Sequence, residues 1–66
     1  MFAEIWHLGD KGAPTKSTLA GPDIDMVVHG DVVEFVAGND NDGALERLIV
    51  PSRLLMLARV SRNATP

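Results

Sequence analysis

Residues 29–53, HGDVVEFVAGNDNDGALERLIVPSR, hold the pattern that decides the fold of this 66-residue chain. In the run at 32–37 the side chains alternate between two apolar sets, and Glu34 is its only charged residue. This alternation predicts a strand that is central in its sheet or covered on both faces. Gly30 before the run predicts a tight turn from the preceding strand, because glycine accepts a positive φ angle. The polar stretch at 38–43 predicts a second, hairpin turn.

The two segments after that turn admit two interpretations. Residues 44–50 and 54–60 are rich in Leu, Met, Ala, Glu and Arg, which all favour helices, and Ser52 could cap a helix at 53–62. An α+β fold with a C-terminal helix at 53–62 is therefore the alternative. We favour strands for both segments, because the hairpin turn leads straight into 44–50 and Pro51 interrupts any continuous helix.

Outside residues 29–53, the segments 2–8 and 24–29 also have the composition of strands. Residues 9–23 contain several Gly, Pro and small polar residues and predict a long loop, with at most a short strand at 15–19. The result is an all-β fold of five strands. We expect a single small β-barrel domain over 1–60 and a frayed tail at 61–66.

Size and composition limit the possible functions. A chain this short buries only about 60% of its unfolded surface, so its core is thin and oligomerisation would help it. The chain has no cysteine and two histidines, His7 and His29, with no spacing that forces them together. Disulfides and cysteine-bound zinc are thereby excluded, and we expect neither a metal nor a cofactor.

Charge and hydropathy bear on location and partners. No apolar run reaches the roughly 18 residues of a membrane span, and no basic region precedes an apolar run at the start, so we expect a cytoplasmic protein with no membrane contact. The net charge of −3 disfavours nucleic-acid binding. A local basic face is expected despite the net charge, because four of the six basic residues lie in the last third of the chain: Arg47, Arg53, Arg59 and Arg62.

With these elements placed, residues 24–57 resemble the SH3-like small β-barrels. In that family a Gly-Asp turn precedes a hydrophobic strand, a polar hairpin follows, and a Pro-Ser turn of 3₁₀ helix leads into a last short strand. The matching features here are Gly30-Asp31, residues 32–37, residues 39–43 and Pro51-Ser52-Arg53. The resemblance implies a small five-stranded SH3-like barrel, in which the loop at 9–23 takes the place of the family's long first loop.

The resemblance does not extend to the family's peptide-binding groove. SH3 domains that bind proline-rich peptides have a tryptophan after the hairpin and a tyrosine after the Pro-Ser turn. Here Ala44 or Leu45 and Leu54 or Leu55 take those places, and the chain has no tyrosine. Since that recognition needs aromatic walls, we do not expect it. GDVVEF is also similar to a motif of swapped-hairpin transcription factors and antitoxins, although residues 9–28 lack the basic helical segment typical of those proteins.

Catalytic and calcium-binding patterns are weak. NDNDG at 39–43 is similar to part of a calcium loop, but the position that needs a glutamate six residues after the glycine is Ile49. His7 or His29 with Asp23, Asp25 or Asp31 could form a metal or acid–base site, yet exposed histidines explain them as well. No serine has a nucleophile context and no phosphate-binding loop precedes a helix. We therefore expect no enzyme.

The surplus of apolar residues near the C-terminus is the most informative functional signal. A strand at 54–58 would have one apolar face without cover, which predicts an interface with a protein partner or a second copy. We expect the interface to use Trp6, Leu54, Leu55, Met56 and Leu57. The predicted function is a non-catalytic protein-binding module, a homodimer that acts as a small bacterial or phage accessory factor or inhibitor. The alternative is a nucleic-acid-binding barrel or swapped-hairpin dimer that uses the four arginines.

Overall fold

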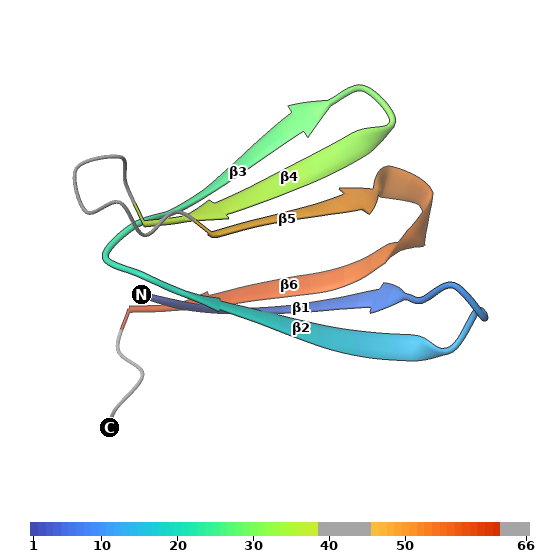
Figure 1. The fold of residues 1–66 in the computed structure, drawn as a ribbon, viewed down its shortest axis with the longest axis horizontal. Coiled ribbons are helices and arrows are strands. Elements are labelled where there is room, and N and C mark those ends of the chain that lie inside the picture. The colour runs from blue at the N-terminus through green and yellow to red at the C-terminus, as the bar shows by residue number, and fades with distance from the viewer. Residues whose placement is uncertain (39–45, 63–66) are drawn as a thin grey trace.

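The computed structural model describes residues 1–38 and 46–62, and it is an all-β structure (Figure 1). No α-helix lies within those ranges. A 3₁₀ turn, η2 (Ser52–Leu54), separates the last two strands. The six strands are β1 (Phe2–Leu8), β2 (Pro14–Ala20), β3 (Ile24–His29), β4 (Val32–Ala37), β5 (Glu46–Pro51) and β6 (Leu55–Ser61).

The strands form two small antiparallel sheets and do not close into a barrel. One sheet has the order β2-β1-β6, which we call sheet A, and the other has the order β3-β4-β5, which we call sheet B. Figure 1 shows the two groups of three strands one above the other, with the chain crossing from β2 to β3 at one end and from β5 to β6 at the other. β1 is therefore the central strand of sheet A, and β4 is the central strand of sheet B.

The core lies between the inner faces of the two sheets. On β4 the alternation in the sequence is realised, since Val33, Phe35 and Ala37 are buried. On β1 the buried residues are Ala3 and Ile5, which follow the same two-residue period. The remaining buried hydrophobic residues are Leu19 and Val50. Each sheet therefore contributes one apolar face, as a two-layer arrangement requires.

The structure corrects the prediction of a long loop at 9–23. Residues Pro14–Ala20 form β2 and pair with β1 along its whole length, so the described chain has six strands where the sequence predicted five. As an edge strand, β2 buries only Leu19 fully. A strand that buries so little needs no apolar alternation, and its small polar residues therefore resembled a loop.

The alternative of a helix at 53–62 is wrong, and the strand interpretation of this segment is confirmed. After η2 the chain continues as β6, which pairs antiparallel with β1. The pairing supplies β6 with hydrogen-bond partners, and this outweighs the helix propensity of its Leu, Met, Ala and Arg residues. β5 and β6 lie one or two residues from their predicted bounds. The predicted hairpin turn at 39–43 and the end of the predicted tail at 63–66 lie outside the described residues.

Two glycines shape the junctions that place the strands. Gly30 has a φ of 67° in the turn between β3 and β4, as the Gly-Asp sequence predicted. Gly21, between β2 and β3, lies against the end of β4, and its N–H donates to the Met1 carbonyl oxygen at 3.0 Å.

Within the ranges that the structure describes, no helix is long and apolar enough to span a membrane.

Candidate functional site

The outer face of sheet A carries an aromatic residue between two cations. Trp6 on β1 is half-buried and lies opposite Lys16 on β2 and Leu57 on β6. The Lys16 ammonium is 5.8 Å from the centre of the indole ring and the Arg59 guanidinium is 5.9 Å from it. Both separations are within the range of cation–π attraction. This face could therefore offer a stacking surface edged by positive charge.

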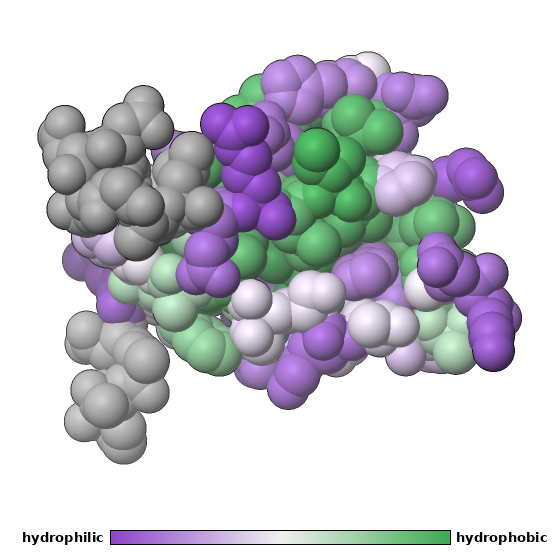
Figure 2. All heavy atoms as spheres, in the orientation of Figure 1, coloured by the Kyte–Doolittle hydropathy of each residue, from purple (hydrophilic) through white to green (hydrophobic). Residues whose placement is uncertain are grey.

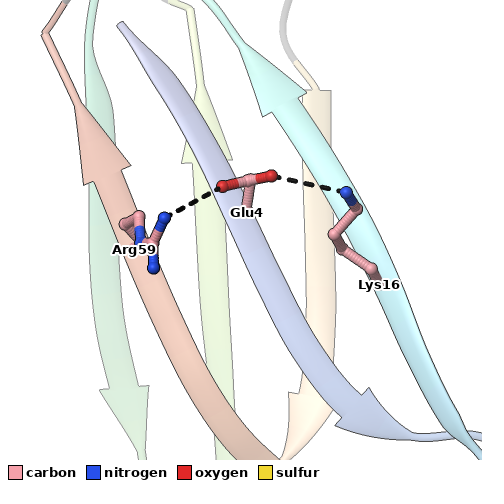
Figure 3. A network of polar contacts seen from close by, with 3 residues as sticks. All are labelled: Glu4, Lys16 and Arg59. Carbon is pink, nitrogen blue, oxygen red and sulfur yellow. Dashed lines mark hydrogen bonds and ion pairs between the residues drawn. The ribbon is translucent and has the colours of Figure 1, made fainter.

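A carboxylate compensates part of that charge. Figure 3 shows Glu4 on β1 between Lys16 and Arg59, which reach it from the two flanking strands. The distance from Lys16 Nζ to Glu4 Oε2 is 3.4 Å, and that from Arg59 Nη1 to Glu4 Oε1 is 4.0 Å. The cationic side chains are 49% and 65% exposed, so solvent screens both pairs and each contributes little to stability. The pairs orient the cations beside Trp6.

The outer face of sheet B is mostly apolar. Ile49 on β5 is 60% exposed and Val27 on β3 is 41% exposed. The register places further apolar residues on this face, namely Val32, Val36 and Pro51. Figure 2 shows hydrophobic residues gathered over β4 and β5. An apolar sheet face without a covering layer in the described chain is the kind of surface that binds another protein.

A charged group lies at the centre of this apolar face. Glu34 on β4 is bonded from both sides, by His29 Nε2 at 3.0 Å from Oε1 and by Arg47 Nε at 3.6 Å from Oε2. The Glu34 side chain is only 18% exposed, whereas those of His29 and Arg47 are 52% and 60% exposed. Each sheet thus has a glutamate on its central strand between two basic side chains.

The residues of the predicted interface are separated by the structure. Leu54 and Leu55 pack against the core and are half-buried. Met56 and Leu57 are 56% and 53% exposed. Met56 lies where the register between β6 and β1 shifts, and Leu57 lies opposite Trp6 on the outer face of sheet A. The exposed part of the predicted set is therefore Met56 and Leu57, and Leu57 lies beside the half-buried Trp6.

The four arginines of the nucleic-acid alternative do not share one face. Arg47 lies on the outer face of sheet B beside Glu34, and Arg59 lies on the outer face of sheet A beside Glu4. Arg53 is exposed within η2, and Arg62 is exposed just after β6. Because β5 and β6 belong to different sheets, their arginines cannot form a single basic stripe.

A hollow of about 460 Å³ lies where the β3–β4 turn meets η2. The Ser52 N–H donates to the Asp31 carbonyl oxygen at 2.8 Å, and the Ser52 hydroxyl donates to the Gly30 carbonyl oxygen at 3.4 Å. The lining residues are Asp31, Val32, Pro51, Ser52 and Arg53. These contacts hold the two turns together.

The histidines lie in separate sheets. His7 Nε2 is 2.9 Å from Ser17 Oγ on the inner side of sheet A, and His29 is on the outer face of sheet B. Among residues 1–38 and 46–62, no group of three or more His, Cys, Asp or Glu residues could hold a metal ion.

Sequence reasoning missed the exposure of β3. Met26, Val27 and Val28 are consecutive and all exposed. The signal for this exposure is that residues 26–28 are apolar on both faces of the strand, as residues 54–58 are.

Comparison with protein-family models, with curated proteins and with solved structures found no match to this chain. The surfaces of the described chain that could bind a partner are the two outer faces and the open edge at β3.

Proposed function

We propose that this chain is a non-catalytic protein-binding module that docks its partner on the outer face of sheet B. The observation that carries the proposal is the exposure of Ile49, at 60%, among the apolar residues that surround the Glu34 cluster on this face. Burying such residues against a partner removes apolar surface from water and stabilises the complex. Residues Val32 and Val36 on the central strand extend the apolar area around Ile49.

The charged centre of the face gives the docking its specificity. Glu34 is held by His29 at 3.0 Å and by Arg47 at 3.6 Å, so its carboxylate has a fixed place among the apolar residues. A partner that covers the face must offer polar groups to this cluster, because a desolvated charge without partners is costly. Complementary polar groups therefore select the partner, while the apolar surround supplies affinity.

At the level of fold, we propose that the two sheets form an open SH3-like arrangement. The proposal is supported by the Gly30 turn before β4 and by the 3₁₀ turn η2 between Pro51 and β6, which match the features that carried the resemblance. For biological role, we propose a cytoplasmic accessory factor or inhibitor of a larger protein, of bacterial or phage origin. We expect a module this small to act by covering part of the surface of that larger protein.

The proposal predicts a site-specific contact at position 49. A photo-reactive amino acid at Ile49 should crosslink one partner protein in the source cells, whereas the same group at exposed Thr18 on β2 should not. With that partner purified, Ile49→Asp should weaken binding at least tenfold, because a carboxylate replaces a buried apolar contact. Titration calorimetry measures the loss. Equal crosslinking at both positions, or unchanged affinity of a folded Ile49→Asp variant, would contradict the proposal.

A second candidate is favoured by the arrangement around Trp6. An aromatic ring with Lys16 and Arg59 within 6 Å is the kind of surface on which a base of single-stranded nucleic acid stacks. If this face binds an oligonucleotide, affinity should fall steeply between about 50 and 200 mM salt. Trp6→Ala should weaken that binding about tenfold, as fluorescence anisotropy would measure. Docking on sheet B, whose affinity comes mainly from apolar burial, predicts a much weaker dependence on salt.

A further inference from the structure

The open edge of sheet B is apolar on the side that faces the core. Met26 and Val28 of β3 pair with Phe35 and Val33 of β4, so their side chains lie on the inner face of the sheet. The two β4 residues are 1% and 5% exposed, whereas Met26 and Val28 are 59% and 62% exposed. Sheet A therefore covers β4 and leaves the inner face of β3 open.

The edge at β3 also has fewer of the features that keep other strand edges from pairing. Proline, charged residues and irregular register are the usual protections. The edge strand β2 begins at Pro14 and carries Lys16, β5 ends at Pro51, and β6 has a shift of register opposite β1. By contrast, β3 pairs with β4 in continuous register over its whole length and contains no proline, glycine, lysine or arginine, although it carries the carboxylate of Asp25.

The backbone of β3 is arranged for a further strand. The Gly38 N–H donates to the Asp23 carbonyl oxygen at 2.9 Å. This bond identifies which residues of β3 form hydrogen-bonded pairs with β4: every second residue, counted from Asp23. Hydrogen-bonded pairs alternate along an antiparallel ladder, so Asp25, Val27 and His29 turn their backbone groups toward β4. Ile24, Met26 and Val28 turn theirs toward the open edge. No other strand of the described chain pairs with that edge.

We propose that β3 pairs antiparallel with β3 of a second copy of this chain, about a two-fold axis at Val27. The pairing joins two copies of sheet B into one continuous six-stranded sheet. Met26 then lies opposite Val28 of the second copy, with both backbones directed toward each other, and Val27 lies opposite its own equivalent. The inference goes beyond the proposed docking on the outer face, because it concerns the backbone edge and a partner of known sequence.

Charge complementarity selects the second copy as the occupant. Asp25 and His29 lie on the outer face, two residues before and two residues after Val27, and both are exposed. Antiparallel pairing centred on Val27 places Asp25 opposite His29 of the second copy, and the two-fold axis repeats the pair. In its protonated form the imidazolium of His29 carries an N–H on both ring nitrogens, so it can donate to Glu34 through Nε2 and to the second copy's Asp25 carboxylate through Nδ1.

The neighbouring register is less favourable. Centred on Met26, it places Asp25 opposite Val27 of the second copy, so that a carboxylate faces a valine on both sides of the axis. Directly opposed pairs on one face of a sheet contribute according to their chemistry, and opposite charges are favourable there. Only the register centred on Val27 pairs the charged residues of β3 with each other and the apolar residues with each other.

A charge exchange tests the pairing. The wild type should show a concentration-dependent dimer in sedimentation equilibrium. Asp25→Lys and His29→Glu should each lower the association constant about tenfold, because the first removes the acceptor opposite the His29 imidazole and the second opposes two carboxylates, each twice in the dimer. The double variant Asp25→Lys/His29→Glu restores opposite charges and should return to within about threefold of the wild type. A monomeric wild type, or folded single variants that the double variant does not rescue, would overturn the proposal.

Disulfide trapping tests the register independently, since the chain has no cysteine of its own. In the proposed dimer the two Val27 Cα atoms are about 4.5 Å apart, within the range of a disulfide. Val27→Cys should therefore crosslink on mild oxidation. In Met26→Cys the two positions are roughly 9 Å apart and should give only the background of Thr18→Cys. Crosslinking of Met26→Cys alone, or of neither β3 variant above that background, would disprove the register.

A further variant separates this inference from the proposed function. Ile49 lies on β5, at the opposite edge of sheet B from β3. Ile49→Asp should leave the dimer constant within about twofold of the wild type while abolishing partner docking. Loss of the dimer in a folded Ile49→Asp variant would show that the copies meet through the face and not through the β3 edge.

Discussion

Phe35→Ala is expected to unfold most of the molecule at room temperature. Phe35 is 1% exposed, and it is among the largest fully buried side chains of the described residues. Truncating a buried phenylalanine costs about 3–5 kcal/mol, from lost transfer free energy and from the cavity that remains. A single core of this size rarely supplies more than about 3–5 kcal/mol. The loss is therefore comparable with the whole stability of the domain.

Urea denaturation followed by circular dichroism measures this loss. Ile49→Ala is the matched control, because it also removes a large apolar side chain from a strand of sheet B but from a position that is 60% exposed. The urea midpoint of Ile49→Ala should correspond to a loss of no more than about 1 kcal/mol in the free energy of unfolding. If the two variants lose equal stability, the core does not lie where the burial of Phe35 places it.

Gly21→Ala is expected to destabilise the junction between the two sheets by about 1–3 kcal/mol. A Cβ at Gly21 would lie 2.7 Å from Gly38 N and 3.2 Å from Gly38 Cα. These atoms are backbone and cannot rotate away, so the chain between β2 and β3 would have to move from the end of β4. Thermal unfolding of the variant measures the cost.

Gly30 supplies the control for that mechanism. Its φ of 67° disfavours a side chain, but nothing lies within 4 Å of an added Cβ. Gly30→Ala should cost about 1–2 kcal/mol, and Gly30→Asn should recover much of that, since asparagine tolerates the left-handed region. Gly21→Asn should be no better than Gly21→Ala, because its cost is steric. Recovery by asparagine at Gly21 would contradict the close-packing explanation.

The sequence alone determined the parts of the fold that depend on local pattern. The alternation at 32–37 placed β4 as a central strand but not which of its faces is buried, and the Gly-Asp pair placed the turn before it. Pro51 with Ser52 placed the break between β5 and β6. These features are local because a two-residue period, a positive φ angle and a missing N–H each act on the residues that carry them.

Only the tertiary structure decided what depends on neighbours distant in sequence. β2 is a strand because β1 pairs with it, and β6 is a strand and not a helix because β1 also pairs with it on the other side. The same holds for the candidate sites. Leu54 and Leu55 pack on the core, while Met26 and Val28, equally apolar and equally in a strand, remain exposed. Which apolar residue is covered depends on how far the opposing sheet extends, and no local pattern encodes that distance.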